Sequence, residues 1–179
     1  MISFVNSTSR NKMTSARSLI FLLTVAMMFN FSHSRHCRGS SSRCPPGWHR
    51  HGNSCYMFSK NTLPWNQALH TCVSLGAGLV AVESHREEKF LQNRLRHEFA
   101  SFMFWLGGSD QYHEHSVWYW IATEKNINSG YTDWHRSEPD HPGKQHCLAM
   151  RKDYNYQWCD DYCHELHAYI CEKSLRFRG

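Results

Sequence analysis

The chain has 179 residues, which is enough for one domain with a hydrophobic core. Its formal net charge of +5 comes from scattered lysines and arginines that form no basic stripe, so the sequence argues against a nucleic-acid-binding surface. Aromatic residues make up 14% of the chain, as expected for a packed interior.

Residues 1–34 are typical of a secretory signal peptide. Positive charges precede an apolar run at residues 18–31, and Ser32 and Ser34 place small side chains where a signal peptidase reads them. The run is shorter than a membrane span requires, and an uncleaved anchor is the competing interpretation. We therefore expect a secreted mature chain with no membrane span.

Eight cysteines follow the signal, and in a secreted chain they indicate a disulfide framework: Cys37, Cys44, Cys55, Cys72, Cys147, Cys159, Cys163 and Cys171. Spacing alone leaves their pairing open. Zinc is the weaker alternative, because the short Cys159 to Cys163 spacing lacks the second close pair of a zinc ribbon. Residues 35–43 form a polar leader, in which Cys37 has no local partner.

The first predicted element is a hairpin from Cys44 to Phe58, which a Cys44–Cys55 bridge would close. Residues 64–75 predict a helix that begins after a proline and ends at glycine. Its apolar side chains recur three and four residues apart, which gives one buried face: Trp65, Ala68, Leu69, Cys72 and Leu75. A short buried strand is expected at residues 79–82.

A capping box of Ser84 and Glu87 predicts the start of a second helix. The inward face of this helix is expected to consist of Phe90, Leu91 and Leu95. From Ser101 the pattern changes to short apolar runs bounded by turn residues, which predict strands at 102–108, 117–121, 147–150, 156–158 and 168–171.

The residues from 123 to 144 show little regular pattern and form a long predicted loop. Inside a compact domain such a loop is functional or disordered, and its aromatic and proline residues favour order. The loop carries Glu138-Pro139-Asp140, and Asp160 lies at the end of a predicted strand. Carboxylates on two segments tied together by sulfur suit a hard divalent cation such as Ca²⁺.

Six motifs taken together, in their order and spacing, resemble the C-type lectin domain family in its long form, and perlucin-type mollusc lectins in particular. They are Cys44-Pro-x-Gly-Trp with Cys55-Tyr, the helix ending at Cys72, Trp105-Leu-Gly-Gly, Glu138-Pro-Asp, Trp158-x-Asp-x-x-Cys163 and Tyr169-Ile-Cys171-Glu172. The resemblance covers residues 44–173 and leaves 174–179 as a tail.

This resemblance implies an α+β fold in which two helices flank small antiparallel sheets and a long loop carries the ligand site. It also implies three disulfides: Cys44–Cys55, Cys72–Cys171 and Cys147–Cys163. Cys37 and Cys159 are left over, and they would pair with each other, pair between chains or stay free. A dimer linked through Cys37 is one hypothesis.

By the same resemblance, five positions hold the calcium ion that contacts sugar: Glu138, Asp140, Gln145, Cys159 and Asp160. The family has Glu where this chain has Gln145, and Asn where it has Cys159. Gln145 keeps an oxygen but loses a charge, which Asp140 restores. A thiol is a soft and poor ligand for calcium, so weaker binding is expected. The peptide bond before Pro139 is expected to be cis.

The resemblance thus implies a secreted protein that binds sugar hydroxyls with calcium, in innate recognition or adhesion, on glycans of microbial or cell surfaces or matrix. Glu138-Pro-Asp mixes two sugar-specificity motifs of the family, which favours mannose-type or mixed recognition. The alternative is a matrix or biomineral protein that uses neither calcium nor sugar. No catalytic motif is present, so no enzyme is predicted.

Histidine is frequent, with fourteen residues in the chain; His135, His141 and His146 lie around the loop, and His164 and His167 follow Cys163. A zinc or copper site is one interpretation of this cluster, but no spacing is diagnostic of it, and surface histidines are the plainer one. Four tryptophans are expected in the core rather than on a ligand platform: Trp105, Trp118, Trp120 and Trp158.

Overall fold

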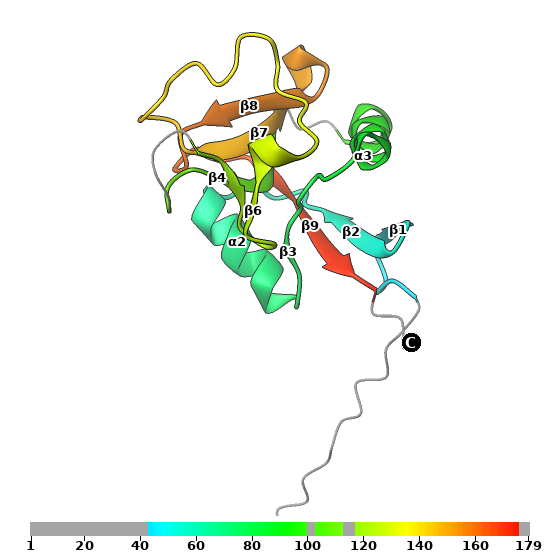
Figure 1. The fold of residues 1–179 in the computed structure, drawn as a ribbon. Helices are drawn as coiled ribbons and strands as arrows, with labels where there is room; N and C mark the ends of the chain where they lie inside the picture. The colour runs from blue at the N-terminus through cyan, green and yellow to red at the C-terminus, as the bar shows by residue number, and fades with distance from the viewer. Residues whose placement is uncertain (1–42, 100–102, 113–116, 176–179) are drawn as a thin grey trace, which may run out of the picture. The chain divides into compact units, whose positions relative to one another are not determined.

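The structure is a computed structural model that describes residues 43–99, 103–112 and 117–175 (Figure 1). The predicted signal peptide, almost all of the leader, Cys37 and most of the C-terminal tail lie outside these residues. In the part that is described, no helix is long and apolar enough to cross a membrane.

The chain enters through the predicted hairpin. β1 (His49–His51) pairs antiparallel with β2 (Ser54–Phe58), and the Cys44–Cys55 disulfide closes the turn. β9 (Ala168–Ser174) lies along the other edge of β2, so the start and the end of the domain are side by side (Figure 1). β3 (Gly78–Leu79) pairs with β9 and is shorter than the strand predicted at 79–82.

The helix predicted at 64–75 is α2 (Trp65–Ser74). Trp65, Ala68 and Cys72 are buried on its inner face, and a Cys72–Cys171 disulfide joins that face to β9. Leu75 was expected on this face but is 45% exposed. The helix ends one residue earlier, and Gly76 then turns the chain away with a positive φ of 66°, a conformation that favours glycine.

The second predicted helix is α3 (His85–Glu98), and its cap forms as expected. Ser84 Oγ accepts a hydrogen bond from the Glu87 N–H at 3.2 Å. Leu91 and Leu95 are buried, as the periodicity predicts. Two polar residues of the same face, Glu88 and Gln92, are buried as well, which the pattern did not predict.

The central strand of the fold is β4 (Met103–Ser109). The remaining strands are β5 (Tyr119–Trp120), β6 (Lys125–Asn126), β7 (Cys147–Arg151) and β8 (Gln157–Asp161), with 3₁₀ turns η1 (Ile127–Ser129) and η2 (Lys152–Tyr154). β7 pairs antiparallel with both β4 and β8. The predicted α+β arrangement of two helices and antiparallel strand pairs is confirmed, and a parallel pairing of β4 with β9 joins the described strands into one nine-stranded sheet.

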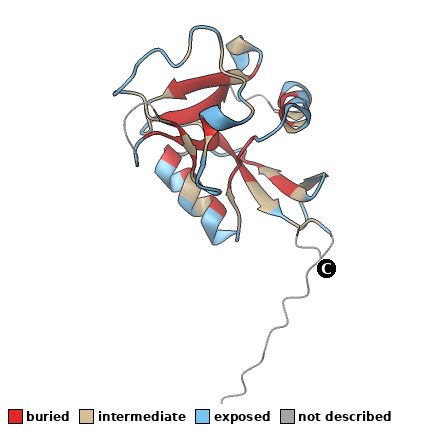
Figure 2. Cartoon of the chain, in the orientation of Figure 1, coloured by how far each residue is buried: buried red, intermediate tan, exposed pale blue. Residues whose placement is uncertain are grey.

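The core lies between this sheet and the inner faces of the helices, where Figure 2 shows β4, β7 and β8 almost wholly buried. The four tryptophans predicted for the core are all buried. Two glycines of β4 permit the close packing: a Cβ at Gly107 would lie 2.7 Å from the Leu79 carbonyl oxygen, and one at Gly108 would lie 2.5 Å from Leu148. This packing is the physical reason for the Trp105-Leu-Gly-Gly motif.

Candidate functional site

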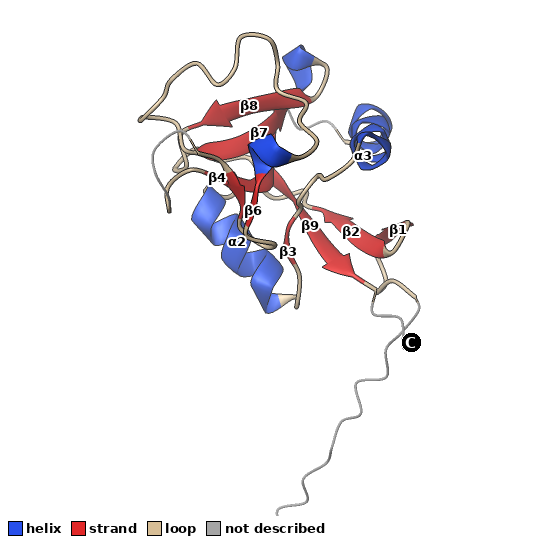
Figure 3. Cartoon of the chain, in the orientation of Figure 1, coloured by secondary structure: helices blue, strands red, loops and turns tan. Residues whose placement is uncertain are grey.

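The long loop is fixed to the sheet by its own backbone. Between η1 and β7 it runs as an irregular excursion beside β8 (Figure 3). Midway, Trp134 forms an isolated parallel bridge with Trp158 of β8. The Trp158 N–H donates to the Asp133 carbonyl, and the His135 N–H donates to the Trp158 carbonyl, both at 2.9 Å. The loop thus meets the strand just before the motif that begins at Glu138.

Glu138, Asp140 and Asp160 come together where the loop meets β8. Each offers one carboxylate oxygen, and these oxygens lie within 4.8 Å of one another. Asp160 is buried, Glu138 is half-buried and Asp140 is exposed, so the group sits at the rim of the domain. The Asp140 N–H donates to Asp160 Oδ1 at 3.3 Å, and the Glu138–Pro139 bond is cis, as the resemblance implied.

Three carboxylates this close repel one another when all are ionised. Burial, the hydrogen bond with Asp160 and the charge of Asp140 together raise the pKa of Glu138 to about 7. A divalent cation would stabilise the ionised form of all three groups in place of a proton.

Three buried oxygens in this region have no hydrogen-bond partner among the described residues: Glu138 Oε2, Gln145 Oε1 and Asp160 Oδ2. A buried acceptor without a donor costs about 1–3 kcal/mol, so oxygens of this kind call for a ligand. Carboxylate and amide oxygens are the ligands that calcium prefers. The oxygens of Glu138, Asp140 and Asp160, and the unpartnered oxygen of Gln145, are therefore of the kind that fits a hard cation.

Cys159, at the fifth family position, does not join the group. Its side chain is buried and its thiol is free, and Sγ donates to the Ala149 carbonyl of the neighbouring strand at 3.7 Å. Burial raises the pKa of this thiol strongly, and the nearby Glu138 charge adds to the effect. A neutral, buried thiol is no ligand for calcium, so this departure from the family removes one ligand.

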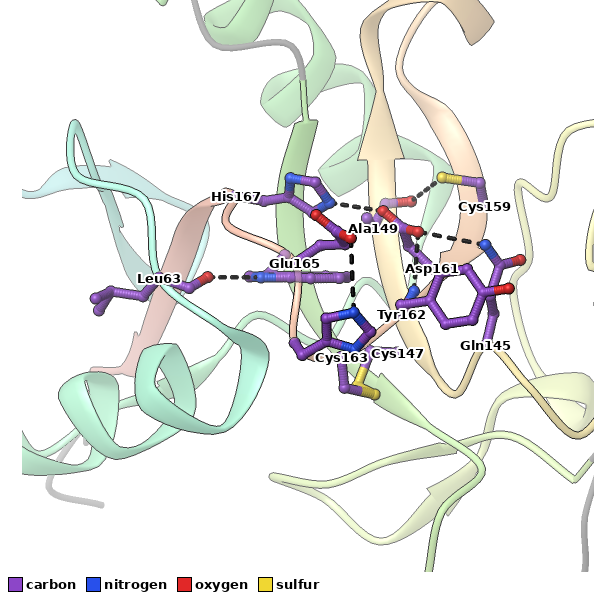
Figure 4. A network of polar contacts seen from close by, with 12 residues as sticks. Leu63, Gln145, Cys147, Ala149, Cys159, Asp161, Tyr162, Cys163, Glu165 and His167 are labelled. Carbon is purple, nitrogen blue, oxygen red and sulfur yellow. Dashed lines mark hydrogen bonds and ion pairs between the residues drawn. A yellow bond between two sulfur atoms is a disulfide. The ribbon is translucent and has the colours of Figure 1, made fainter.

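Sequence reasoning missed a second polar network, which is centred on Asp161 (Figure 4). Asp161 accepts hydrogen bonds from His167 Nε2 at 2.6 Å, from the Tyr162 N–H at 2.8 Å and from Gln145 Nε2 at 3.3 Å. Burial by itself would raise the pKa of Asp161, but the bonds from His167 and Tyr162 outweigh burial and lower it. Asp161 is therefore an ionised acceptor that holds the Gln145 side chain.

The loop histidines each contact a neighbouring side chain. His135 stacks on Tyr154 with ring centroids 3.9 Å apart, His141 pairs with Asp140, and His146 Nδ1 lies 2.7 Å from Asp110. No cluster of three or more metal-ligating His, Cys, Asp or Glu side chains that includes a histidine occurs within the described ranges. The interpretation as a zinc or copper site thus gains no support from these residues.

The chain matches a known family of domains. The family model described as "Lectin C-type domain" matches residues 61–173. The chain belongs to the C-type lectin domain family. The three disulfides that the resemblance implied are all present, as Cys44–Cys55, Cys72–Cys171 and Cys147–Cys163.

Among its relatives is perlucin from Haliotis laevigata, which is 34% identical over 133 residues, covering 73% of this chain and 83% of perlucin. Among solved structures, the carbohydrate-recognition domain of the mouse scavenger receptor C-type lectin is 26% identical with a TM-score of 0.66, covering 76% of this chain and all of that domain. A calcium-independent type II antifreeze protein gives the same identity and TM-score, covering 76% of this chain and 98% of its own. One of these two structures is a carbohydrate-recognition domain and the other is an antifreeze protein, so the same fold serves both.

Proposed function

We propose that this chain is a secreted carbohydrate-binding protein that binds sugar hydroxyls through one calcium ion. Glu138, Asp140, Gln145 and Asp160 would hold the ion at the rim of the domain. The observation that carries the proposal is the set of three buried oxygens without a hydrogen-bond donor, which belong to Glu138, Gln145 and Asp160. When bound, the ion supplies open coordination positions for two neighbouring hydroxyl oxygens.

The residues of the chain select the sugar by their hydrogen-bonding groups. When ionised, the carboxylates of Glu138 and Asp140 can accept hydrogen bonds but cannot donate them, so they favour sugar hydroxyl groups that donate toward them. The amide N–H group of Gln145 donates a hydrogen bond to Asp161, so only its side-chain carbonyl oxygen is left to contact a ligand. We expect mannose-type or mixed recognition, because the motif reads Glu138-Pro-Asp.

Secretion is supported by the signal-like N-terminus and by three disulfides, which form in oxidising compartments. The expected partners are glycans on microbial or cell surfaces or in matrix, in innate recognition or adhesion. One shallow sugar site binds weakly, so useful avidity needs several copies on one partner. A dimer linked through Cys37 would supply two, and a non-reducing gel tests for it.

The test is a calcium titration of chelator-stripped protein by isothermal calorimetry, followed by chromatography on mannose and galactose resins. Wild type should take up one calcium ion, bind resin with calcium and elute with chelator. Asp160→Asn should lose both properties. Asp153→Asn, which removes an exposed carboxylate in η2, is the matched control and should keep them. Absence of calcium uptake at millimolar concentration would remove the proposal.

A matrix or mineral-associated role without calcium or sugar is the second candidate. Two observations favour it: the buried thiol of Cys159 replaces a ligand, and a calcium-independent antifreeze protein has a similar fold. Resin binding that ignores chelator, or binding to mineral by wild type and Asp160→Asn alike, would support this candidate instead.

A further inference from the structure

We infer that Asp161 and His167 position the Gln145 side chain, and that the carboxylate of Asp161 makes glutamine, not glutamate, the ligand that fits at position 145. The inference adds Asp161 and His167, which lie outside the set proposed to hold the ion, as positioning residues for Gln145, and it rests on the proposed calcium site. Figure 4 shows the three side chains in line, with Gln145 and His167 on opposite sides of Asp161.

The first step is the orientation of the Gln145 amide. Its Nε2 donates to Asp161 Oδ1 at 3.3 Å, a long hydrogen bond, while its Oε1 is buried and has no partner in the part of the chain that is described. The amide is planar, so holding the nitrogen on Asp161 turns the oxygen away from it. The oxygen is thereby presented to a ligand before any ligand arrives, which is the preorganisation that an ion site needs.

The second step is the rigidity of Asp161. Oδ2 accepts from His167 Nε2 at 2.6 Å, and Oδ1 accepts from the Tyr162 N–H at 2.8 Å. His167 exchanges two backbone hydrogen bonds with Leu63, at 2.9 and 3.2 Å, and its ring lies 4.4 Å from the Trp105 ring. Asp161 is therefore held from the core side and cannot easily follow a movement of Gln145.

The third step is charge. A glutamate at position 145 would place a carboxylate oxygen where the amide nitrogen now donates to Asp161. Two carboxylate oxygens would then face each other across 3.3 Å with no hydrogen between them. The new side chain would lose its hydrogen bond and turn away from Asp161, so its oxygen would no longer be held for a ligand. A negative charge at 145 should therefore weaken calcium binding, although added charge alone would strengthen it.

The experiment is a charge exchange between positions 145 and 161. Calcium affinity is measured by calorimetry for wild type, Gln145→Glu, Asp161→Asn and the double variant. Gln145→Glu alone should bind calcium at least tenfold more weakly than wild type. The double variant should bind calcium more tightly than Gln145→Glu, because it removes the repulsion between the two carboxylates, and it should stay below wild type, because an amide nitrogen in place of Oδ1 would face the Tyr162 N–H donor. Tighter binding by Gln145→Glu alone overturns the inference.

A matched control exists on the same strand as Asp161. Gln157 Nε2 donates to Asp133 Oδ1, also at 3.3 Å, but neither side chain belongs to the carboxylate group. Gln157→Glu therefore creates a similar pair of opposed carboxylates outside the site. It should leave calcium affinity within twofold of wild type, and a loss as large as that of Gln145→Glu would attribute the effect to general destabilisation and overturn the inference.

A readout without metal separates this inference from the proposed function. In chelator, the melting temperature should fall for Gln145→Glu and recover in the double variant, because the opposed carboxylates exist in the apo protein. His167→Phe, which keeps a ring against Trp105 but removes the donor to Asp161, should weaken calcium binding, and His167→Gln should partly restore it. If wild type binds no calcium, the proposed function fails, and the melting temperatures in chelator alone test whether Asp161 opposes a negative charge at position 145. Equal melting temperatures of Gln145→Glu and the double variant would overturn the inference.

Discussion

Replacing Glu88 by glutamine should stabilise the fold at neutral and alkaline pH, and the gain should disappear in acid. Glu88 lies on α3 with no exposed surface. Its Oε2 accepts from Trp158 Nε1 at 2.9 Å, and its Oε1 accepts from Gln92 Nε2 at 2.8 Å. The same Gln92 nitrogen donates to Asp133 at 3.0 Å, so two carboxylates share one amide donor.

The size of the effect follows from the pKa. Burial and the charge of Asp133, against the lowering effect of the hydrogen bonds from Trp158 and Gln92, raise the pKa of Glu88 from 4.5 to about 8. Between these two values the folded protein keeps a proton that the unfolded chain has released, so stability is greatest below pH 4.5 and falls as pH rises toward 8. The full difference corresponds to about 5 kcal/mol of unfolding free energy above pH 8.

Glutamine at position 88 removes the charge and keeps an oxygen for Trp158. It also turns an amide nitrogen toward the Gln92 donor, which costs about 1–3 kcal/mol. The variant should therefore be more stable than wild type by about 2 kcal/mol or more at pH 8, and no more stable than wild type at pH 5.

Denaturant unfolding with the disulfides intact, followed by tryptophan fluorescence between pH 5 and 8, measures this difference. Glu87 also has a raised pKa, about 7 because of burial, so the wild-type slope has several sources and the difference between variants is the readout. Glu165→Gln, on an exposed loop, controls for the loss of one negative charge. Parallel stability curves for wild type and Glu88→Gln would show that the buried carboxylate titrates normally and would refute the reasoning.

Three further outcomes are expected. The Cys159 thiol is buried and its pKa is raised, so it should resist iodoacetamide at pH 8 in native protein and react fully in denaturant; mass spectrometry showing native labelling would contradict this. Calcium affinity should fall about tenfold per pH unit below pH 7, since the pKa of Glu138 is about 7 and its proton must leave, whereas calorimetry showing a pH-independent affinity would contradict it. Removing the Cys72–Cys171 bridge, which spans 99 residues, should lower the unfolding free energy by about 4–5 kcal/mol in denaturant titrations, and a loss below 1 kcal/mol would argue against the chain-entropy account.

Much of the fold was accessible from the sequence because local signals act over one helical turn or one hairpin. The buried face of α2, the Ser84 cap and the Cys44–Cys55 hairpin all depend on spacings of a few residues. The other two bridges came from the resemblance, since spacing left their pairing open. The error at Leu75 arose because the apolar periodicity continues one residue beyond the end of α2 at Ser74, just before the turn at Gly76.

The polar interior could not be predicted, because its partners are distant in sequence. A glutamate in a helix is ordinarily assigned to the surface, and nothing near Glu88 indicates that its acceptor oxygen meets an indole seventy positions away. Asp161 was overlooked for a related reason. It follows a predicted ligand, Asp160, and its role depends on His167, which local pattern assigns to a polar surface loop.

These two networks explain how a single rim site can depend on the whole domain. The loop reaches Glu138 only after its backbone has paired with Trp158, whose indole is held by Glu88 of α3. On the other side, Gln145 is oriented by Asp161, which the core holds through His167. The carboxylates that would bind the ion are therefore held close together by contacts to the core, although their charges repel. A bound cation relieves this repulsion without requiring the side chains to move apart.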